Sequence, residues 1–217
     1  KIANRIDGFV EKNPNRELDY WKKSNMTYIH HQLIKFSGLE TALACRPNDT
    51  VTILDAGCGV GHLVETIVNM GFKEEQFGIS GFDISEKALQ VARQNHPSHN
   101  WFLSSFHGIV DSEVAGKQFD FGICACPLCY ALGKNHMDIL TEELTIIKQF
   151  STHGAGCLLY TDRMDWKVTP NTVFVRFNPE QLKHFEELGF KLHVDQSVID
   201  AHFGKSYDEL DMFYISW

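Results

Sequence analysis

The chain has 217 residues and carries 20 Lys and Arg against 28 Asp and Glu, so its formal net charge is −8. This acidic balance, without a basic cluster, argues against a general nucleic-acid binder, and no apolar run approaches the roughly 20 residues that cross a membrane. Hydrophobic residues form 43% of the sequence and charged residues 22%, as in globular proteins, and the length suffices for one sizeable α/β core.

The N-terminal part has a helical pattern. Asn13-Pro14 is typical of a helix start, with Asn as N-cap and Pro as first helical residue, and predicts a helix to about residue 23. A longer helix is expected over residues 27–44, where apolar side chains recur on one face. We therefore expect residues 1–48 to form an N-terminal helical cap and residues 49–217 the main domain.

From residue 51 onward, strand and helix patterns alternate. Strands are expected at residues 51–55, 77–83, 101–104, 119–125, 156–162, 190–198 and 212–217, and helices at 62–70, 85–94, 138–150 and 179–189. No helix separates the last two strands, and parallel neighbours need a long crossover, so these two are expected to pair antiparallel. The sequence predicts an α/β, Rossmann-like fold with a seven-stranded, mostly parallel sheet and an antiparallel C-terminal hairpin.

Residues 51–85 are the most informative stretch. Three apolar residues lead into Asp55-Ala56-Gly57-Cys58-Gly59-Val60-Gly61, and a helix pattern follows. Glycine has no Cβ, so the backbone can turn sharply and a ligand can come close. The helix behind it turns unpaired N–H groups toward that ligand. Asp83, at the tip of the next strand, can accept hydrogen bonds from both hydroxyls of a ribose.

This motif, together with Asp83, resembles the class I S-adenosylmethionine-dependent methyltransferases. The resemblance extends over residues 51–217 and includes the strand count and the closing hairpin. It implies an enzyme that moves a methyl group from S-adenosylmethionine to an O or N atom of a small-molecule metabolite or natural product. The acidic net charge and the lack of a long apolar run predict no nucleic-acid or membrane partner. The N-terminal helices would then be the substrate-side cap that small-molecule members often add.

The resemblance implies cofactor-binding roles at individual positions. Gly57, Gly59 and Gly61, with Cys58 between them, would let the backbone approach the methionine and ribose parts. Asp55 would organise the amino group, directly or through water. Asp83 would hold the ribose hydroxyls, and Ile84 would pack on the adenine.

Two further cofactor contacts are expected beyond that motif. The family usually has an acidic residue after the third strand, where it meets the adenine amine, but this chain has Ser105-Phe106 there. Adenine recognition would therefore rest on Ser105 and the backbone of Phe106. Cys124, at the end of the fourth strand, falls where the family's backbone meets the methionine moiety.

The N-terminal segment carries an aromatic and imidazole cluster. Tyr20 and Trp21 are expected to close over the cofactor, although packing of the cap on the domain explains them equally well. A histidine near neutrality suits removal of the acceptor's proton, so His31 and His107 are candidate general bases, with Tyr130 as a positioning group. Many enzymes of this type accelerate methyl transfer mostly by holding donor and acceptor close together, so the reaction does not require a single essential base.

Cys124, Cys126 and Cys129 invite a metal interpretation. Structural zinc usually takes four ligands from paired short spacings, and no second pair exists here. His107 or His136 would have to supply a fourth ligand, so we expect a buried strand that enters the active-site loop, and no metal. The segment also lacks the D/N-P-P-Y/F tetrad of exocyclic-amine DNA methyltransferases.

Two alternatives to an active methyltransferase stay open at this stage. The sequence also predicts where in the cell the protein is located. Ser105 at the adenine position is compatible with a catalytically silent cofactor-binding subunit. A nicotinamide-dependent oxidoreductase would carry G-x-G-x-x-G rather than the G-x-G-x-G found here, and the Asp55 carboxylate would sit poorly beside a pyrophosphate. Six cysteines without a disulfide pattern and no visible signal peptide predict a cytoplasmic protein.

Overall fold

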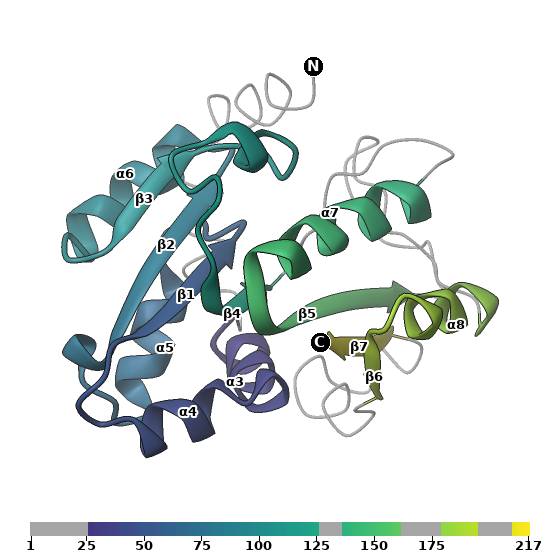
Figure 1. Ribbon diagram of the computed structural model, residues 1–217, viewed down its shortest axis with the longest axis horizontal. Coiled ribbons are helices and arrows are strands. Elements are labelled where there is room, and N and C mark those ends of the chain that lie inside the picture. Colours follow the sequence, from purple (N-terminus) through teal and green to yellow (C-terminus); the bar gives the residue numbers. More distant parts are fainter. Residues whose placement is uncertain (1–25, 126–135, 162–178, 195–209) are drawn as a thin grey trace.

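The computed structural model describes residues 26–125, 136–161, 179–194 and 210–217, which build a seven-stranded sheet (Figure 1). The strands lie in the order β3-β2-β1-β4-β5-β7-β6. Their bounds are β1 (Val51–Ala56), β2 (Phe77–Asp83), β3 (Asn100–Leu103), β4 (Phe119–Cys124), β5 (Ser151–Thr161), β6 (Lys191–Val194) and β7 (Leu210–Ser216). Strands β1 to β5 are parallel, and β7 runs antiparallel to β5 and β6. This confirms the predicted Rossmann-like sheet and its antiparallel C-terminal pair.

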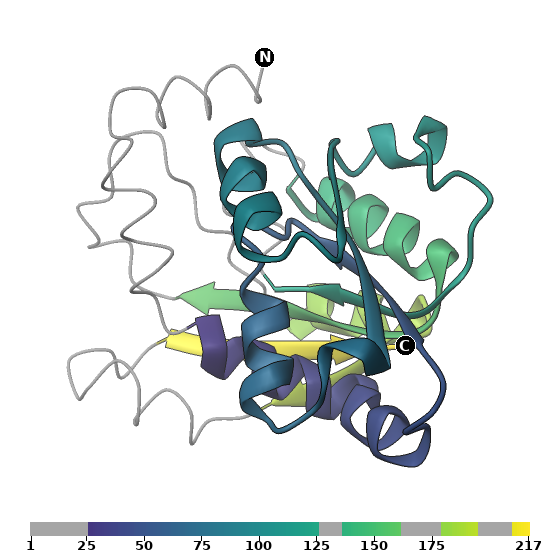
Figure 2. The same cartoon turned by 90° about the vertical axis from the view of Figure 1, so that its left-hand side faces the viewer.

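Helices cover both faces of this sheet. They are α3 (Met26–Ser37), α4 (Leu39–Cys45), α5 (His62–Asn69), α6 (Glu86–Asn95), α7 (His136–Phe150) and α8 (Pro179–Glu187), with short 3-10 turns η1 (Glu74–Gln76) and η2 (Gly108–Asp111). One buried apolar cluster joins the sheet to α3, α4, α5 and α6, and a second joins it to α7 and α8. Figures 1 and 2 show α5 and α7 on opposite sides of the sheet.

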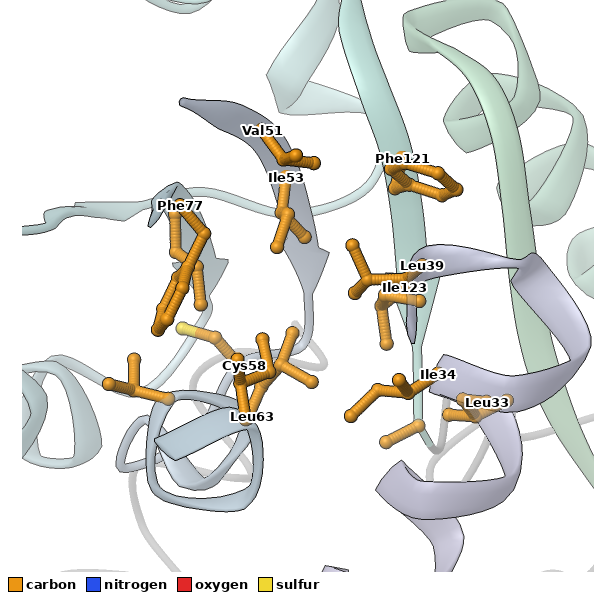
Figure 3. Close-up of a cluster of buried hydrophobic side chains, with 14 of the residues drawn as sticks. Leu33, Ile34, Leu39, Val51, Ile53, Cys58, Leu63, Phe77, Phe121 and Ile123 are labelled. Atoms are coloured by element: carbon orange, nitrogen blue, oxygen red, sulfur yellow. The ribbon is translucent and has the colours of Figure 1, made fainter. Parts of the chain in front are cut away.

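Strand β1 shows how the sequence distributes its side chains between these faces. Val51 and Ile53 belong to the cluster under α3 and α5, whereas Leu54 and Ala56 belong to the cluster under α7. Successive side chains of a strand point to opposite faces, so Asp55 faces the same side as Val51 and Ile53. In Figure 3, side chains of β1 and β4 approach those of α3 and the start of α5 on that side.

The prediction of a single helix over residues 27–44 is wrong, because two helices, α3 and α4, span this stretch. Gly38 adopts φ 82 and ends α3, and α4 begins at the next residue. The left-handed conformation ends a helix, and glycine adopts it without a Cβ penalty. Ser37 consolidates the break, because its hydroxyl donates to the carbonyl of Ile34 and accepts from the N–H of Leu39.

Strand β5 begins at Ser151, five residues before the predicted start at Gly156. The predicted helix end at Phe150 is confirmed, but no loop follows it. Ser151 Oγ donates to the carbonyl of Ile147, 2.9 Å away, and the chain enters the sheet at once. Gly154 lies so close to the ring of Trp217 that a Cβ would clash. Gly154 therefore leaves room for Trp217 and adds no apolar side chain to the strand pattern.

The other boundaries agree within about two residues wherever the structure describes them. The helix predicted over residues 13–23 lies outside the described residues, as does the C-terminal part of the sixth predicted strand. Helices α3 and α4 contribute Leu33, Ile34, Leu39 and Leu43 to the core, each fully buried. None of the helices in the described part of the chain is long and apolar enough to cross a membrane.

Candidate active site

The loop between β1 and α5 places three glycines in the left-handed region. The φ angles are +72° at Gly57, +54° at Gly59 and +87° at Gly61, so a residue with a Cβ would be strained at each position. A Cβ on Gly57 or Gly59 would meet no described atom within 4 Å. Within the described part of the chain, the first two glycines therefore leave room for a ligand to approach the backbone.

Gly61 is surrounded by protein instead. A Cβ there would lie 2.9 Å from Cδ2 of His96 and 3.3 Å from Cη2 of Trp101. The Trp101 ring also lies against Gly81 of β2, again too close for a Cβ. The indole Nε1–H donates to the carbonyl of His96 at 2.9 Å. The third glycine thus serves packing between the loop and the β3 edge.

Asp83, at the end of β2, ties this loop to the start of α6. Its Oδ2 accepts from the N–H of Gly59 at 3.0 Å, and its Oδ1 accepts from the N–H of Ser85 at 2.9 Å. Burial raises the pKa of Asp83, and these backbone bonds counteract part of that rise. Each carboxylate oxygen has a second lone pair, so the group can hold the loop and still accept from a ligand hydroxyl. Asp83 ends the second strand as the sequence predicts, and its bond to Gly59 is a role that the sequence did not reveal.

Asp55 is the most perturbed acid of the loop. It is 1% exposed, and its Oδ2 is buried without a hydrogen-bond partner. Burial, followed by the charge of Asp83, raises the pKa of Asp55 to about 8. A buried carboxyl without a partner is unfavourable unless a donor or cation satisfies it. The position is therefore suited to a cationic ligand group.

The residues predicted at the adenine end are used partly by the protein itself. Ser105 Oγ accepts from the N–H of Gly108 at 3.0 Å, and the Ser105 carbonyl accepts from the N–H of Ile109 at 3.1 Å. Phe106 packs edge-on against Phe82, with ring centroids 5.3 Å apart. Ser105 thus shapes the turn after β3.

Two of the predicted cofactor residues contribute buried side chains. The Cys58 thiol lies in the apolar cluster under α5, where burial raises its pKa well above its ordinary value. Cys124 is fully buried in the cluster under α7. Ile84, next to Asp83, is half-buried.

The candidate catalytic residues are spread over different elements. His107 Nε2 lies 3.2 Å from Glu142 Oε2 of α7, and both side chains are more than half exposed. His31 lies on α3 and is half-buried. Tyr20, Trp21 and Tyr130 lie outside the described residues, as do Cys126 and Cys129. Among the residues that the structure describes, no group of three His, Cys, Asp or Glu could hold a metal ion.

His30, rather than its neighbour His31, is the buried histidine of α3. It is 4% exposed, and its Nδ1 is buried without a hydrogen-bond partner. Burial, then the charges of His62 and His31, lowers the pKa of His30 to about 3. Helical spacing could have found it, because Leu33 and Ile34, three and four residues later, are fully buried on the same face.

His62, the first residue of α5, completes the polar surroundings of the loop. Its Nε2 is buried without a partner, and its Nδ1 lies 3.5 Å from Glu65 Oε2. The other oxygen of Glu65 lies 3.8 Å from His96 Nε2. No pattern in the sequence singles out His62 among the 11 histidines.

A family model described as "Methyltransferase domain" matches residues 47–183. The chain belongs to the class I S-adenosylmethionine-dependent methyltransferases. The match includes the glycine loop, Asp83 and strands β1 to β5, so it confirms the resemblance read from the motif. It also removes support for the nicotinamide alternative.

Individual relatives are more distant. The release factor glutamine methyltransferase of Enterococcus faecalis is 28% identical over 89 residues, which cover 41% of this chain and 31% of that protein. The match thus spans about a third of the length of this curated relative.

Two solved structures share the fold of this methyltransferase. The plantazolicin methyltransferase BamL, solved with a triazolic desmethylPZN analogue and SAH, is 15% identical, with a TM-score of 0.59 over 99% of this chain and 94% of BamL. CalS10, an amino pentose methyltransferase of Micromonospora echinaspora solved with SAM, is 14% identical, with a TM-score of 0.52 over 84% of this chain and 89% of CalS10. At these identities the two structures show a shared fold and no more.

Proposed function

We propose that this methyltransferase transfers the methyl group of S-adenosylmethionine to an O or N atom of a small-molecule metabolite or natural product. The observation that carries the cofactor site is the buried carboxyl of Asp55, whose Oδ2 has no partner beside a loop with open space. A fixed carboxylate there suits the ammonium group of the methionine end. Gly57 and Gly59 would let the backbone approach the cofactor.

The remaining cofactor contacts follow from the same edge of the sheet. Asp83 has lone pairs left for the two ribose hydroxyls after holding Gly59 and Ser85. Ile84 would pack on the adenine, with Phe106 beside it. The Ser105 carbonyl would contribute less than the sequence suggested, because it already accepts from Ser104 Oγ and from the Ile109 N–H, whereas the hydroxyl accepts only from the Gly108 N–H and keeps its own O–H for donation.

In catalysis the cofactor supplies an activated methyl group on a sulfonium. The chain must hold the acceptor in line, exclude water and receive the proton that an O–H or N–H acceptor loses. His107, paired with Glu142, and His31 are the candidate bases. Glu142 Oε2 lies 3.2 Å from His107 Nε2, so this carboxylate can hold the orientation of the imidazole.

The small-molecule acceptor is supported by two kinds of observation. BamL, a plantazolicin methyltransferase, aligns with 99% of this chain, and CalS10 is an amino pentose methyltransferase. The net charge of −8 disfavours a nucleic-acid acceptor. The Enterococcus faecalis relative points to a protein acceptor, but its match covers 41% of this chain.

The test is binding followed by turnover. Isothermal titration should show SAH binding to the intact protein and weaker binding to Asp83→Asn. Mass spectrometry across a panel of hydroxyl and amine acceptors should then show methylated products that disappear without S-adenosylmethionine. Absence of SAH binding would refute the proposed cofactor site.

A second candidate is a cofactor-binding subunit without transferase activity. Ser105 favours it, because the family usually has an acid at this position and the Ser105 hydroxyl accepts a bond within its own turn. Tight SAH binding without turnover on any acceptor of the panel, including a release-factor peptide, would support this alternative.

A further inference from the structure

His62, the first residue of α5, connects the interior beside the glycine loop with the protein surface. Its Nε2 is buried and has no hydrogen-bond partner. Its Nδ1 lies 3.5 Å from Oε2 of Glu65, whose side chain is 51% exposed. Buried polar atoms are normally paired, so the Nε2 atom points to a ligand group that completes its surroundings. The ring therefore has one nitrogen in the interior and the other beside a surface carboxylate.

Glu65 holds this imidazole in a defined orientation. Residues three apart lie on the same side of a helix, so the side chains of His62 and Glu65 meet on α5. The carboxylate favours the tautomer with the proton on Nδ1, which leaves the lone pair of Nε2 available as a proton acceptor. The other oxygen of Glu65, Oε1, lies 3.8 Å from Nε2 of His96, whose ring lies beside Gly61. Glu65 is thus placed between two imidazoles.

The charges around His62 are compatible with a proton on its ring. Helix α3 packs against α5 and carries His30. Burial, and next the charge of His62, lowers the pKa of His30 to about 3, which indicates that the two imidazoles lie near each other. His30 is therefore neutral at physiological pH and does not oppose a positive charge on His62. The ionisable groups around His62 are Glu65 on its own helix, His96 after α6, His30 and His31 on α3, and Asp55 on the same face of β1.

We propose that His62 takes the proton of the methyl acceptor on Nε2 and passes a proton from Nδ1 to Glu65 at the surface. The inference rests on the proposed function, because an O–H or N–H acceptor loses a proton as it is methylated. The acceptor's lone pair forms the bond to the methyl carbon, while the methyl–sulfur bond breaks and leaves its electron pair on sulfur. The acceptor's proton goes to Nε2, and the Nδ1 proton moves to the Glu65 carboxylate and from there to water.

His62 lies where such a base is needed. The acceptor atom has to come within about 3.5 Å of the methyl carbon. The glycine loop that would hold the methyl-bearing end of the cofactor ends at Gly61, one residue before His62. A base acts over about 2.6–3.2 Å, or through one water molecule. His107 differs from His62, because its Nε2 itself lies beside Glu142 and both of these side chains are more than half exposed.

The first test is turnover at saturating S-adenosylmethionine, with a hydroxyl or amine acceptor identified in the panel. His62→Gln, which cannot take up a proton, should lower kcat about 100-fold and keep the Kd of SAH within about twofold. Glu65→Leu should also lower kcat, and Glu65→Gln, whose amide oxygen still accepts from Nδ1–H, should lose less. Wild-type kcat should fall toward acid pH as Nε2 becomes protonated, and this fall should be absent from His62→Gln.

The second test needs no acceptor. Proton–nitrogen correlation NMR spectra of the histidine rings in the ligand-free protein should show His62 protonated on Nδ1, with its signal assigned by its absence from His62→Gln. Glu65→Leu should move part of this proton to Nε2. The matched control is His184→Gln, because His184 Nδ1 lies 3.9 Å from Glu187 Oε2 at the same spacing on α8, where the imidazole is half exposed. It should leave kcat unchanged.

The outcomes separate the inference from the proposed function. A proton on Nε2 of His62 in the wild-type protein, or an unchanged kcat in His62→Gln, would overturn the inference and leave the proposed function intact. Loss of SAH affinity in His62→Gln without loss of kcat would do the same. Thermal melts establish that each variant is folded, and the surface variants of Glu65 carry both tests if His62→Gln is not. If the wild-type protein methylates no acceptor of the panel, the proposed function fails and the inference with it.

Discussion

Asp55→Asn should change how the stability of the ligand-free protein depends on pH. The pKa of Asp55 is about 8 in the folded protein, against an ordinary value of 3.8. Between these values the folded state holds a proton that the unfolded state releases, so rising pH destabilises the wild-type protein. The slope is about 1.4 kcal/mol per pH unit until the folded pKa is reached. Asn carries no charge and removes this dependence.

The magnitude follows from the position of that pKa. Between pH 6 and pH 9 the wild-type protein should lose about 3 kcal/mol that the variant keeps, because the slope ends near pH 8. Urea unfolding at pH 6, 7, 8 and 9 measures the gap. Asp120→Asn is the control, since hydrogen bonds from Thr52 and Arg46 lower the pKa of Asp120 and place its titration below this range.

The same carboxyl predicts the pH dependence of binding. A ligand ammonium needs the ionised form of Asp55, so SAH affinity of the wild-type protein should rise from pH 6 to pH 8, by up to about 100-fold. Asp55→Asn should bind SAH weakly with a flat profile over that range. A wild-type affinity that does not change with pH, or an unfolding gap that stays constant, would refute the reasoning.

Three further predictions concern other parts of the site. Gly61→Ala should destabilise the protein by about 1–3 kcal/mol, because φ is +87° and the new Cβ would clash with the ring of His96. Urea unfolding measures the loss of stability, and an unchanged unfolding midpoint would contradict the prediction. Asp83→Asn should weaken SAH binding about tenfold, and it should speed hydrogen exchange at the Gly59 amide, which donates to that carboxylate. Unchanged exchange at the Gly59 amide would contradict the role of Asp83 in holding the loop. His107→Gln should lower kcat about 100-fold or more without changing SAH affinity if His107 is the base, and His31→Gln tests the other candidate in the same assay.

Much of the fold could be predicted because periodicity and turn residues were consistent with each other. The alternation of apolar strands and amphipathic helices predicts the parallel sheet, and the missing helix before the last strand predicts antiparallel pairing. The cap residue Ser85 is confirmed, since its hydroxyl accepts from the N–H of Ala88 at 3.3 Å. The break at Gly38 was missed because one glycine inside a helical pattern is often tolerated.

The site was harder to predict than the fold, because it depends on direction and distance. Helical spacing relative to Leu33 and Ile34 favours His30 over His31 as the residue that faces the sheet, but that these two residues are fully buried appears only in the structure. The bond from Gly59 to Asp83 joins residues 24 positions apart and appears only when β1 and β2 pair.

The Trp101 indole has an evolutionary consequence. It fills the space beside Gly81, where no Cβ fits while the indole is there, whereas at Gly61 the ring of His96 is the closer obstacle. Position 81 is therefore coupled to position 101: relatives with a smaller side chain at 101 gain room for Ala or Ser at 81, whereas relatives that keep the indole must keep glycine. A sequence alignment would record this as covariation between an edge strand and the strand beside the cofactor loop, although neither residue needs to touch the ligand.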